Sequence, residues 1–407
     1  MDTFQPQPIP ANIHDRDIYI ERMRPFIGQS LIKVLTGQRR VGKSYLFFQL
    51  MREIGKTDKN ARIIYVNKED LRFDAIRTAR DLNDYLQTQI KKTSQNYIFI
   101  DEIQGIEHFE TALRSLLLDK NNDLYITGSN AKLLSGELAT HLSGRYIEFP
   151  VYSLSYPEFL QFHKLPDADE SLNQYLTYGG LPYLINLPLT NLAFEYIKSV
   201  YSTIVFRDVV SRFNVRNTGF LEKLIAFLAD NTGSIFSAKK ISDYLKSQKT
   251  VIQVNQVLNY TTYLANAFLI HQVSRHDIKG KRIFEIGEKY YFENLGIRNA
   301  IVGYRPADRG KLLENAVYNH LLYTGWKVTT GVLPSGEIDF VCEKSGETKY
   351  VQVALRLDGK KTIEREFGNL LEIDDNYPKY VISTDDTFPN THEGIAHLHI
   401  REFLMQQ

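Results

Sequence analysis

The sequence predicts an α/β protein, and two alternating patterns of strands and helices carry this prediction. In the first 150 residues, short segments rich in β-branched residues alternate with helical segments at the spacing of a parallel sheet. From residue 310 onward, a second alternation predicts a smaller α/β region. Residues 155–230, between these two regions, have a mostly helical pattern.

Length and composition restrict the class of protein. The chain has 407 residues, of which 43% are hydrophobic and 24% charged, so we expect a globular protein of two or three domains. The net charge of +1 neither requires nor excludes nucleic acid as a partner. The single cysteine, Cys342, cannot form an internal disulfide, which favours a reducing, cytoplasmic compartment. No apolar run approaches the roughly 18 residues of a membrane helix, and the N-terminus lacks the pattern of a signal peptide, so we expect no membrane association.

The first alternation contains five predicted strands. These are Ser30–Leu35, Ala61–Val66, Asn96–Ile100, Asp123–Thr127 and Arg145–Phe149. A helix is expected after the first strand, ending at Gly55, and a short one near residues 18–24, ended by Pro25. Further helices are expected at Ala75–Lys92, Phe109–Leu118 and Ala131–Leu142.

A glycine-rich segment follows the first strand and opens the next helix. Its sequence, GQRRVGKS, matches the phosphate-binding pattern GxxxxGK[ST] at every position. The glycines let the loop curl so that its backbone N–H groups face phosphate oxygens, and the helix N-terminus adds positive potential. The predicted nucleotide-binding residues are Gly37, Gln38, Arg39, Arg40, Val41, Gly42, Lys43, Ser44 and Tyr45.

This segment predicts ATP and Mg²⁺ as cofactors. Lys43 is expected to reach the β- and γ-phosphates, and the Ser44 hydroxyl to ligate the metal.

Two acids end the third predicted strand. In a parallel sheet the carboxyl ends of strands line the ligand crevice, so Asp101 and Glu102 are expected beside the phosphate loop. We assign Asp101 to hold magnesium, directly or through water, and Glu102 to act as the general base toward the attacking water.

Polar side chains also follow the fourth strand. Thr127 and Ser129 are both candidates to sense the γ-phosphate or to orient the water, and the sequence does not separate them. Ser129 or Asn130 equally suits the N-cap of the helix expected at Ala131.

Arg145 precedes the fifth strand. If it reaches the γ-phosphate of a neighbouring subunit it is an arginine finger, which implies a homo-oligomer. The alternative is a surface ion pair.

The segment from residue 220 to 292 has the order helix, helix, helix and β-hairpin, which is similar to a winged helix. Ser237 is expected to cap one helix, and Thr250 with Gln253 to form a capping box for Val251–Asn266. The hairpin is expected to turn at Lys279–Gly280.

Several stretches resemble bacterial and archaeal AAA-type ATPases whose chain ends in a characteristic domain of unknown function. The stretches are LTGQRRVGKSYL, NYIFIDEIQ, LYITGSNAKLLSGELATHLSGRY, SLSYPEF, YGGLP, FRDVV, GEIDFV and YVQVA. The resemblance implies an AAA/ASCE-like P-loop NTPase core, a helical and winged-helix middle, and a C-terminal domain similar to PD-(D/E)XK restriction endonucleases. For YGGLP and FRDVV we favour structural roles, as a glycine corner and a helix packing face.

Together, pattern and resemblance divide the chain into five parts. These are a tail (1–17), the P-loop ATPase core (18–150), a helical linker or lid (151–219), a winged-helix-like domain (220–305) and a PD-(D/E)XK-like domain (306–407).

The nuclease-like part lacks part of the chemistry that its resemblance implies. Glu314 on a helix and Asp339 on a strand match the two acids, but the Glu-x-Lys position contains Gln352 and Ala354. A neutral amide with two carboxylates makes a weak magnesium site, so we expect a retained fold with degenerate chemistry. The alternative is that Gln352 is tolerated while Arg356 stabilises charge; Glu337 could also turn inward.

A local basic region makes DNA a candidate partner. Basic residues flank the predicted helices and hairpin at Lys239, Lys240, Lys246, Lys249, Arg275, His276, Lys279, Lys281 and Arg282. The last predicted helix presents base-reading side chains at Gln253, Asn255, Gln256 and Asn259. A winged helix also serves as a protein contact, so this prediction has a structural alternative.

The sequence therefore predicts a magnesium-dependent ATPase that acts as a molecular switch or regulator. The first alternative is a DNA-binding regulator controlled by ATP through the winged helix. The second is an ATP-gated nuclease.

Overall fold

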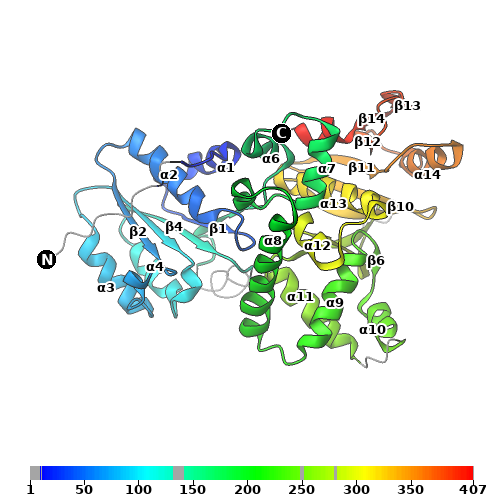
Figure 1. Ribbon diagram of the computed structural model, residues 1–407. Coiled ribbons are helices and arrows are strands. Elements are labelled where there is room, and N and C mark those ends of the chain that lie inside the picture. Colours follow the sequence, from blue (N-terminus) through cyan, green and yellow to red (C-terminus); the bar gives the residue numbers. More distant parts are fainter. Residues whose placement is uncertain (1–9, 11, 132–141, 248–251, 279–281, 407) are drawn as a thin grey trace. The chain divides into compact units, whose positions relative to one another are not determined.

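The computed structural model describes residues 10, 12–131, 142–247, 252–278 and 282–406. The chain divides into two compact units (Figure 1). The first contains residues 1–152 with 266–268, and the second contains 153–265 with 269–407. The end of the first unit lies close to the predicted end of the ATPase core. The finer division of the second unit into three domains stays a prediction.

The first unit is built on a five-stranded sheet in the order β2-β3-β4-β1-β5, and every neighbouring pair is parallel. The strands are β1 (Ile32–Thr36), β2 (Arg62–Asn67), β3 (Asn96–Asp101), β4 (Asn122–Gly128) and β5 (Tyr146–Pro150). These bounds confirm all five predicted strands and the predicted parallel sheet. Since the strands run in one direction, the residues that follow β1, β3 and β4 meet at a single edge.

Four α-helices of the first unit lie within its described residues: α1 (Asp17–Met23), α2 (Lys43–Thr57), α3 (Ala79–Gln89) and α4 (Phe109–Leu116). The core joins apolar strand residues such as Ile98 and Ile126 to Leu82, Leu86 and Leu113 of the helices. This packing fixes the sheet edge that carries the polar residues.

Several predicted helix boundaries of the first unit are wrong. The helices expected to end at Lys92 and Leu118 end at Gln89 and Leu116. Gly55 does not end α2, which continues to Thr57, because Gly55 does not adopt the positive φ of a terminating glycine. The helix expected from Ala75 begins only at Ala79, because Thr78 and Asp81 form a capping box there. The helix expected at Ala131–Leu142 falls almost wholly outside the described residues.

The second unit contains a nine-stranded mixed sheet in the order β13-β14-β12-β11-β10-β9-β7-β8-β6. The strands are β6 (Ile235–Phe236), β7 (Ile270–Asp277), β8 (Arg282–Phe292), β9 (Lys327–Val332), β10 (Glu337–Lys344), β11 (Glu347–Val353), β12 (Lys379–Ser383), β13 (Thr391–His392) and β14 (Ile395–His399). The sequence did not predict β13 and β14. Because β7 pairs with β9, the hairpin of the middle region and the C-terminal strands form one continuous sheet.

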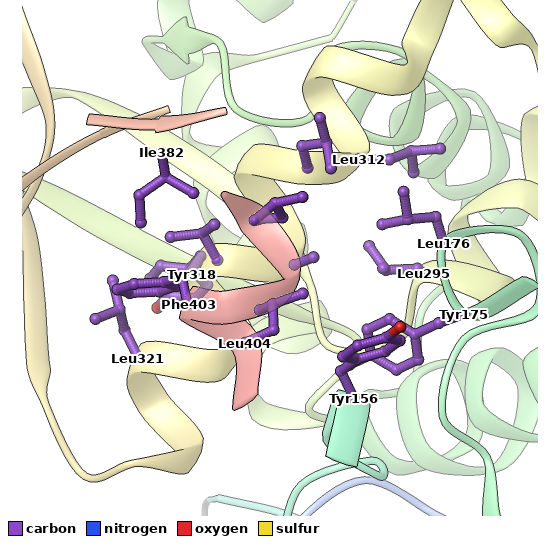
Figure 2. Packing of buried hydrophobic residues seen from close by; sticks show 14 of the residues in the cluster. Tyr156, Tyr175, Leu176, Leu295, Leu312, Tyr318, Leu321, Ile382, Phe403 and Leu404 are labelled. Atoms are coloured by element: carbon purple, nitrogen blue, oxygen red, sulfur yellow. The ribbon is translucent and has the colours of Figure 1, made fainter. Parts of the chain in front are cut away.

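Several helices of the second unit contribute to one apolar cluster. The helices of this unit within the described residues are α6 (Tyr156–His163), α7 (Asp169–Tyr178), α8 (Asn191–Thr203), the π-helix η6 (Ile204–Ser211), α9 (Thr218–Asp230), α10 (Ala238–Ser247), α11 (Val254–Asn266), α12 (Leu295–Val302), α13 (Arg309–Tyr323), α14 (Lys360–Leu371) and α15 (Ile400–Met405). Those that contribute to the cluster are α6, α7, α12, α13 and α15. Figure 2 shows Tyr156, Leu295, Leu312 and Leu404 of this cluster, which come from α6, α12, α13 and α15. The cluster therefore connects the region after residue 153 to the end of the chain.

Short 3₁₀ helices complete the described secondary structure. They are η1 (Arg24–Phe26), η2 (Leu71–Phe73), η3 (Ile103–Gly105), η5 (Pro182–Asn186) and η7 (Pro306–Asp308). Within the described parts of the chain, no helix has the length and apolarity needed to cross a membrane.

The predicted helix caps and turns of the middle region are confirmed in part. Ser237 precedes α10, and its hydroxyl accepts from Lys240 N at 3.2 Å, as predicted. Thr250 and the turn at Lys279–Gly280 lie outside the described residues, and α11 begins at Val254. Gly180 forms a close corner, because a Cβ there would lie 2.3 Å from the Leu154 carbonyl oxygen.

Candidate functional site

The phosphate-binding pattern forms a tight loop between β1 and α2. Gly37 has φ 143°, and a Cβ there would lie 2.1 Å from the Val151 carbonyl oxygen, so only glycine fits. Gly42, with φ 97°, lies directly before α2. The two glycines thus supply the curl that places the helix N-terminus at the loop.

Lys43 is the first residue of α2, and its side chain turns back across the loop. It is 5% exposed, and its Nζ donates to the carbonyl oxygens of Gly37 at 2.9 Å and Gln38 at 3.1 Å. The ammonium therefore lies inside the curl of the loop, at the position where phosphate oxygens bind in such loops.

The remaining loop residues take different positions. Arg39 is buried and lies 3.3 Å from Glu69, whereas Arg40 is exposed with a left-handed φ of 71°. Tyr45 is 54% exposed, and its ring packs edge-on against Phe48.

Asp101 is the last residue of β3 and lies at the same sheet edge. Three hydroxyl groups donate to its carboxylate, those of Ser44, Thr127 and Tyr65, with the Tyr65 bond at 3.0 Å. Burial raises the pKa of Asp101, although these three donors act in the opposite direction. The fold thus joins the predicted metal ligands Ser44 and Asp101.

Glu102 follows in a left-handed backbone conformation, φ 56° and ψ 52°, which is uncommon for a side-chain-bearing residue. Its N–H donates to Thr127 Oγ1 at 2.9 Å, and its Oε2 accepts from Ser129 Oγ at 3.2 Å and from Gln104. Burial alone would raise the pKa of Glu102, but the charges of Lys43 and Arg39 and the hydrogen bonds from Gln104 and Ser129 together outweigh burial and lower it. Glu102 is therefore held as a carboxylate next to the loop.

Thr127 and Ser129, which the sequence did not separate, contact different atoms. The Thr127 hydroxyl donates to Asp101 and accepts from the backbone of Glu102, whereas the Ser129 hydroxyl donates to the Glu102 carboxylate. Thr127 thus fixes the backbone between the two acids, and Ser129 contacts the predicted base.

Arg145 does not join these residues within its own chain. It is exposed and lies just before β5, and its carbonyl oxygen accepts from Ile32 N at the amino end of β1. The guanidinium is therefore available on the surface of the first unit.

Sequence reasoning missed two partners of the acids, Tyr65 and Gln104. Tyr65 lies in β2, which pairs with β3, and Asn67 of β2 is opposite Asp101. Strand adjacency would have identified Tyr65 once the order β2-β3 was known. Gln104 is part of the quoted IDEIQ motif, but its contact depends on the turn at η3.

Two comparisons of sequence identify the chain's relatives. The AAA domain family matches residues 29–160, and a domain of unknown function (DUF8612) matches residues 169–308. An uncharacterized protein of Haemophilus influenzae is 34% identical over 401 residues, covering 96% of this chain and 98% of its own. The chain belongs to this family of AAA-domain proteins.

Further matches of the AAA-domain protein agree with this membership. An uncharacterized protein of Methanocaldococcus jannaschii is 30% identical over 364 residues, covering 86% of this chain and 79% of its own. The solved structure of a Walker-type ATPase of Pyrococcus abyssi covers 71% of this chain and 96% of its own, with a TM-score of 0.52 and 17% identity. The latter is a likeness of fold. These findings support an AAA-type P-loop domain and nucleotide binding.

The comparisons support the resemblance in its coarser form. A domain of unknown function is matched at residues 169–308. It spans parts of the regions predicted as helical linker and winged helix. The nuclease-like and winged-helix assignments are not confirmed by these matches.

The second unit brings Glu314 and Asp339 together, as the sequence predicted for that pair. Both carboxylates accept from Lys289 Nζ at 2.9 Å, a residue that the sequence did not single out. Burial and the Asp339 charge raise the pKa of Glu314 to about 7. Burial opposes the charged form of Lys289, but the two acids raise its pKa above the usual value.

Gln352 lies beside this pair but turns its side chain to other groups. Its Oε1 accepts from Asp339 N at 3.1 Å, and its Nε2 donates to Glu366 Oε2 at 2.9 Å. Arg356 lies 3.3 Å from Asp358, and Glu337 lies 3.9 Å from Arg275. The ion pairs of Arg356 and Glu337 are thus formed with residues other than Glu314 and Asp339.

Proposed function

We propose that the first unit binds ATP with Mg²⁺ and hydrolyses it. The observation that carries the proposal is the position of Asp101, which accepts from Ser44 of the phosphate loop while Glu102 lies beside it under the charge of Lys43. The proposal is supported because oxygens suited to a metal, an ammonium suited to phosphate and a carboxylate suited to act as a base lie at one edge of the sheet.

Each residue has a distinct role in this proposal. Lys43 and the loop N–H groups bind the β- and γ-phosphates, and Ser44 with Asp101 holds Mg²⁺. Oxygen ligands of this kind are the ones that Mg²⁺ prefers, and the ion supplies charge neutralisation on the phosphates when bound. Glu102, kept ionised by Lys43 and Arg39, accepts a proton from the attacking water.

Thr127 is the better candidate for setting the geometry of the two acids. It contacts Asp101 and the backbone of Glu102, so a γ-phosphate that altered either acid would alter its hydrogen bonds. Ser129, through its bond to the Glu102 carboxylate, is assigned to orient the base.

The test is ATP turnover by the full chain with Mg²⁺. Lys43→Ala is expected to reduce turnover by roughly 100-fold or more, because it removes a charge that stabilises the transferring phosphoryl group. The matched control is Lys56→Ala, at an exposed position in the last turn of the same helix. Equal turnover of the two variants would contradict the proposal.

We further propose that the ATPase acts as a switch in a homo-oligomer through Arg145. Its exposure at the start of β5 supports a role toward a neighbouring subunit, as an arginine finger requires. In that case turnover per chain rises with protein concentration. A rate per chain that stays constant over a wide dilution range would exclude the finger.

A second candidate function is DNA binding by the middle region, under the control of ATP. The supporting observation is the element order α9, β6, α10, α11, β7 and β8, in which β8 pairs antiparallel with both β6 and β7. This order is similar to that of a winged helix, which supports the proposal. On α11, Asn255 and Asn259 are exposed, and Gln253 is exposed just before it.

Binding of a short duplex at several salt concentrations tests this candidate. Replacing Lys239 and Lys240, both exposed on α10, by Gln is expected to weaken binding and flatten its salt dependence. The matched control replaces Lys91 and Lys92, which lie in the first unit. Equal affinities of the two double variants would exclude this surface.

The ATP-gated nuclease is the hypothesis that the contacts support least. Lys289 contacts both acids, and Gln352 engages Asp339 N and Glu366 instead of pointing its oxygen at the acids. We therefore keep the degenerate nuclease-like assignment of Glu314, Asp339 and Gln352 as a proposal. Plasmid cleavage in Mg²⁺ or Mn²⁺ that is lost on Asp339→Ala would overturn it.

A further inference from the structure

Lys289 and two acids form a buried charge cluster in the second unit. Lys289 comes from β8, Glu314 from α13 and Asp339 from β10. The side chains of the three residues are 5%, 18% and 12% exposed. Three elements distant in sequence therefore converge on one ammonium below the surface.

The distances from Lys289 Nζ to the two acids are those of hydrogen bonds to an ammonium and are longer than metal–oxygen bonds. Lys289 Nζ lies 2.9 Å from Glu314 Oε1 and 2.9 Å from Asp339 Oδ1. This is the usual length of an N–H···O bond, whereas Mg²⁺ binds oxygen at about 2.1 Å. The two acids are thus spaced around the lysine.

Two further donors reach the acids. The Tyr291 hydroxyl donates at 2.5 Å to Glu314 Oε1, the same oxygen that accepts from Lys289, and Val353 N donates to Asp339 Oδ2 at 3.0 Å. The backbone of Gly233 passes over Glu314, because a Cβ there would lie 3.1 Å from both carboxylate oxygens. The cluster is therefore enclosed by the chain.

The cluster has the arrangement of a cation bridging two acids. One ammonium contacts two carboxylates that come from different elements, and a divalent ion held by oxygen ligands bridges carboxylates in the same way.

We propose that Lys289 is a built-in cation that occupies the position at which Glu314 and Asp339 would otherwise bind a divalent metal. The wild-type cluster therefore excludes divalent ions and stabilises the junction of β8, α13 and β10. Removal of the lysine side chain converts the cluster into a divalent-cation site with two carboxylate ligands. This inference is independent of the proposed ATPase activity.

Mn²⁺ alone is the probe, applied to the full chain without nucleotide. Lys289→Ala opens space and leaves two buried acids together, so its Tm in chelator is expected to fall below that of the wild type. Mn²⁺ is expected to restore the Tm of this variant, and electron paramagnetic resonance is expected to count about one more bound Mn²⁺ per chain than in the wild type.

The matched control is Lys289→Ala with Asp339→Asn, which removes the lysine and one ligand together. It is expected to gain neither the bound Mn²⁺ nor the restored Tm. Equal Mn²⁺ binding by Lys289→Ala and this double variant would overturn the proposal.

A second comparison does not depend on folding of the lysine variants. The wild type and Asp339→Asn are expected to bind the same number of Mn²⁺ ions. If the wild type binds one more ion than Asp339→Asn, its cluster already accepts a metal and the proposal is wrong.

Discussion

Each unit contains a lysine beside two acidic residues, but the two lysines have different partners. In the first unit, Lys43 donates to the carbonyl oxygens of Gly37 and Gln38 and affects Glu102 through its charge. In the second unit, Lys289 donates directly to both Glu314 and Asp339. The same residue types therefore form two different hydrogen-bonding environments.

The two lysines differ in the hydrogen-bond acceptors that surround them. A glycine loop supplies carbonyl acceptors to Lys43, and its acids meet hydroxyl donors from Ser44, Thr127 and Ser129, which a metal or a water can replace. Lys289 lies in β8 opposite Val273, and its side chain donates to the two acids instead of to backbone carbonyl oxygens. The two lysines thus differ in the groups that hold them, which are backbone carbonyl oxygens for Lys43 and carboxylates for Lys289.

The largest effect that this comparison predicts is on Glu102. Glu102→Gln keeps the shape and the hydrogen bond from Ser129 but removes the base, so turnover should fall by roughly 100- to 10,000-fold while ATP binding is retained. Steady-state turnover and equilibrium binding of labelled ATP measure the two quantities. Glu107→Gln, at an exposed position nearby, is the control. Normal turnover of Glu102→Gln would remove Glu102 from the mechanism.

The next effect separates Thr127 from Ser129. Thr127→Val removes a hydroxyl that joins Asp101 to the backbone of Glu102, leaving buried polar groups without it, at a cost of about 1–3 kcal/mol. Turnover should therefore fall by roughly 5- to 150-fold. Ser129→Ala removes one bond to Glu102 and should cost less. A larger loss for Ser129→Ala would reverse the assignment of the two residues.

Much of the first unit was predictable because its signals are local. Apolar strands followed by polar residues gave the five parallel strands, and the glycine pattern placed Lys43 and Ser44 at a helix start. Tyr65 and its bond to Asp101 could not be found in this way, because the contact depends on which strands are neighbours. The buried pair of Lys33 and Asp123 illustrates the same limit.

The second unit was predictable only in part because its contacts are long-range. Glu314 and Asp339 were found through a motif, but Lys289 is 50 residues from Asp339 and belongs to no motif. The short strands β13 and β14 near the end of the chain were missed since two to five residues give little periodicity. The continuity of β7 with β9 follows from packing and not from sequence pattern.

The stability of the second unit is expected to depend on pH through His320, a buried histidine whose contribution differs from that of the acids around Lys289. Burial lowers the pKa of His320 from 6.5 to about 3, so the folded protein keeps it neutral. Below pH 6.5 the unfolded chain binds a proton at His320 that the folded chain does not, so the His320 contribution to stability falls as the pH decreases, by at most about 1.4 kcal/mol per pH unit. Glu314, with its raised pKa, contributes in the opposite direction over this range. Above pH 6.5 the His320 contribution is fully present.

His320→Leu should flatten this dependence between pH 7 and pH 5. Urea unfolding followed by the fluorescence of Trp326, the only tryptophan, reports on the second unit. The control is His108→Asn, because the His108 side chain is 84% exposed and Asn tolerates its left-handed backbone. An unchanged slope in His320→Leu would show that other groups cause the acid sensitivity.

The smallest predicted effect concerns the hydroxyl that orients Asp101. Tyr65 donates to Asp101 Oδ2 at 3.0 Å, and burial, with the Asp101 charge, raises the pKa of Tyr65, so it remains a donor. Tyr65→Phe removes one hydrogen bond, worth about 1 kcal/mol, without removing a metal ligand. The Mg²⁺ concentration for half-maximal turnover should therefore rise roughly fivefold while the maximal rate changes little.

Tyr97→Phe is the control, since its hydroxyl lies 3.4 Å from Asp58 at the other end of the same sheet. An unchanged Mg²⁺ requirement in Tyr65→Phe would mean that Ser44 and Thr127 alone fix Asp101, and that the hydroxyl donors around this acid are not equivalent.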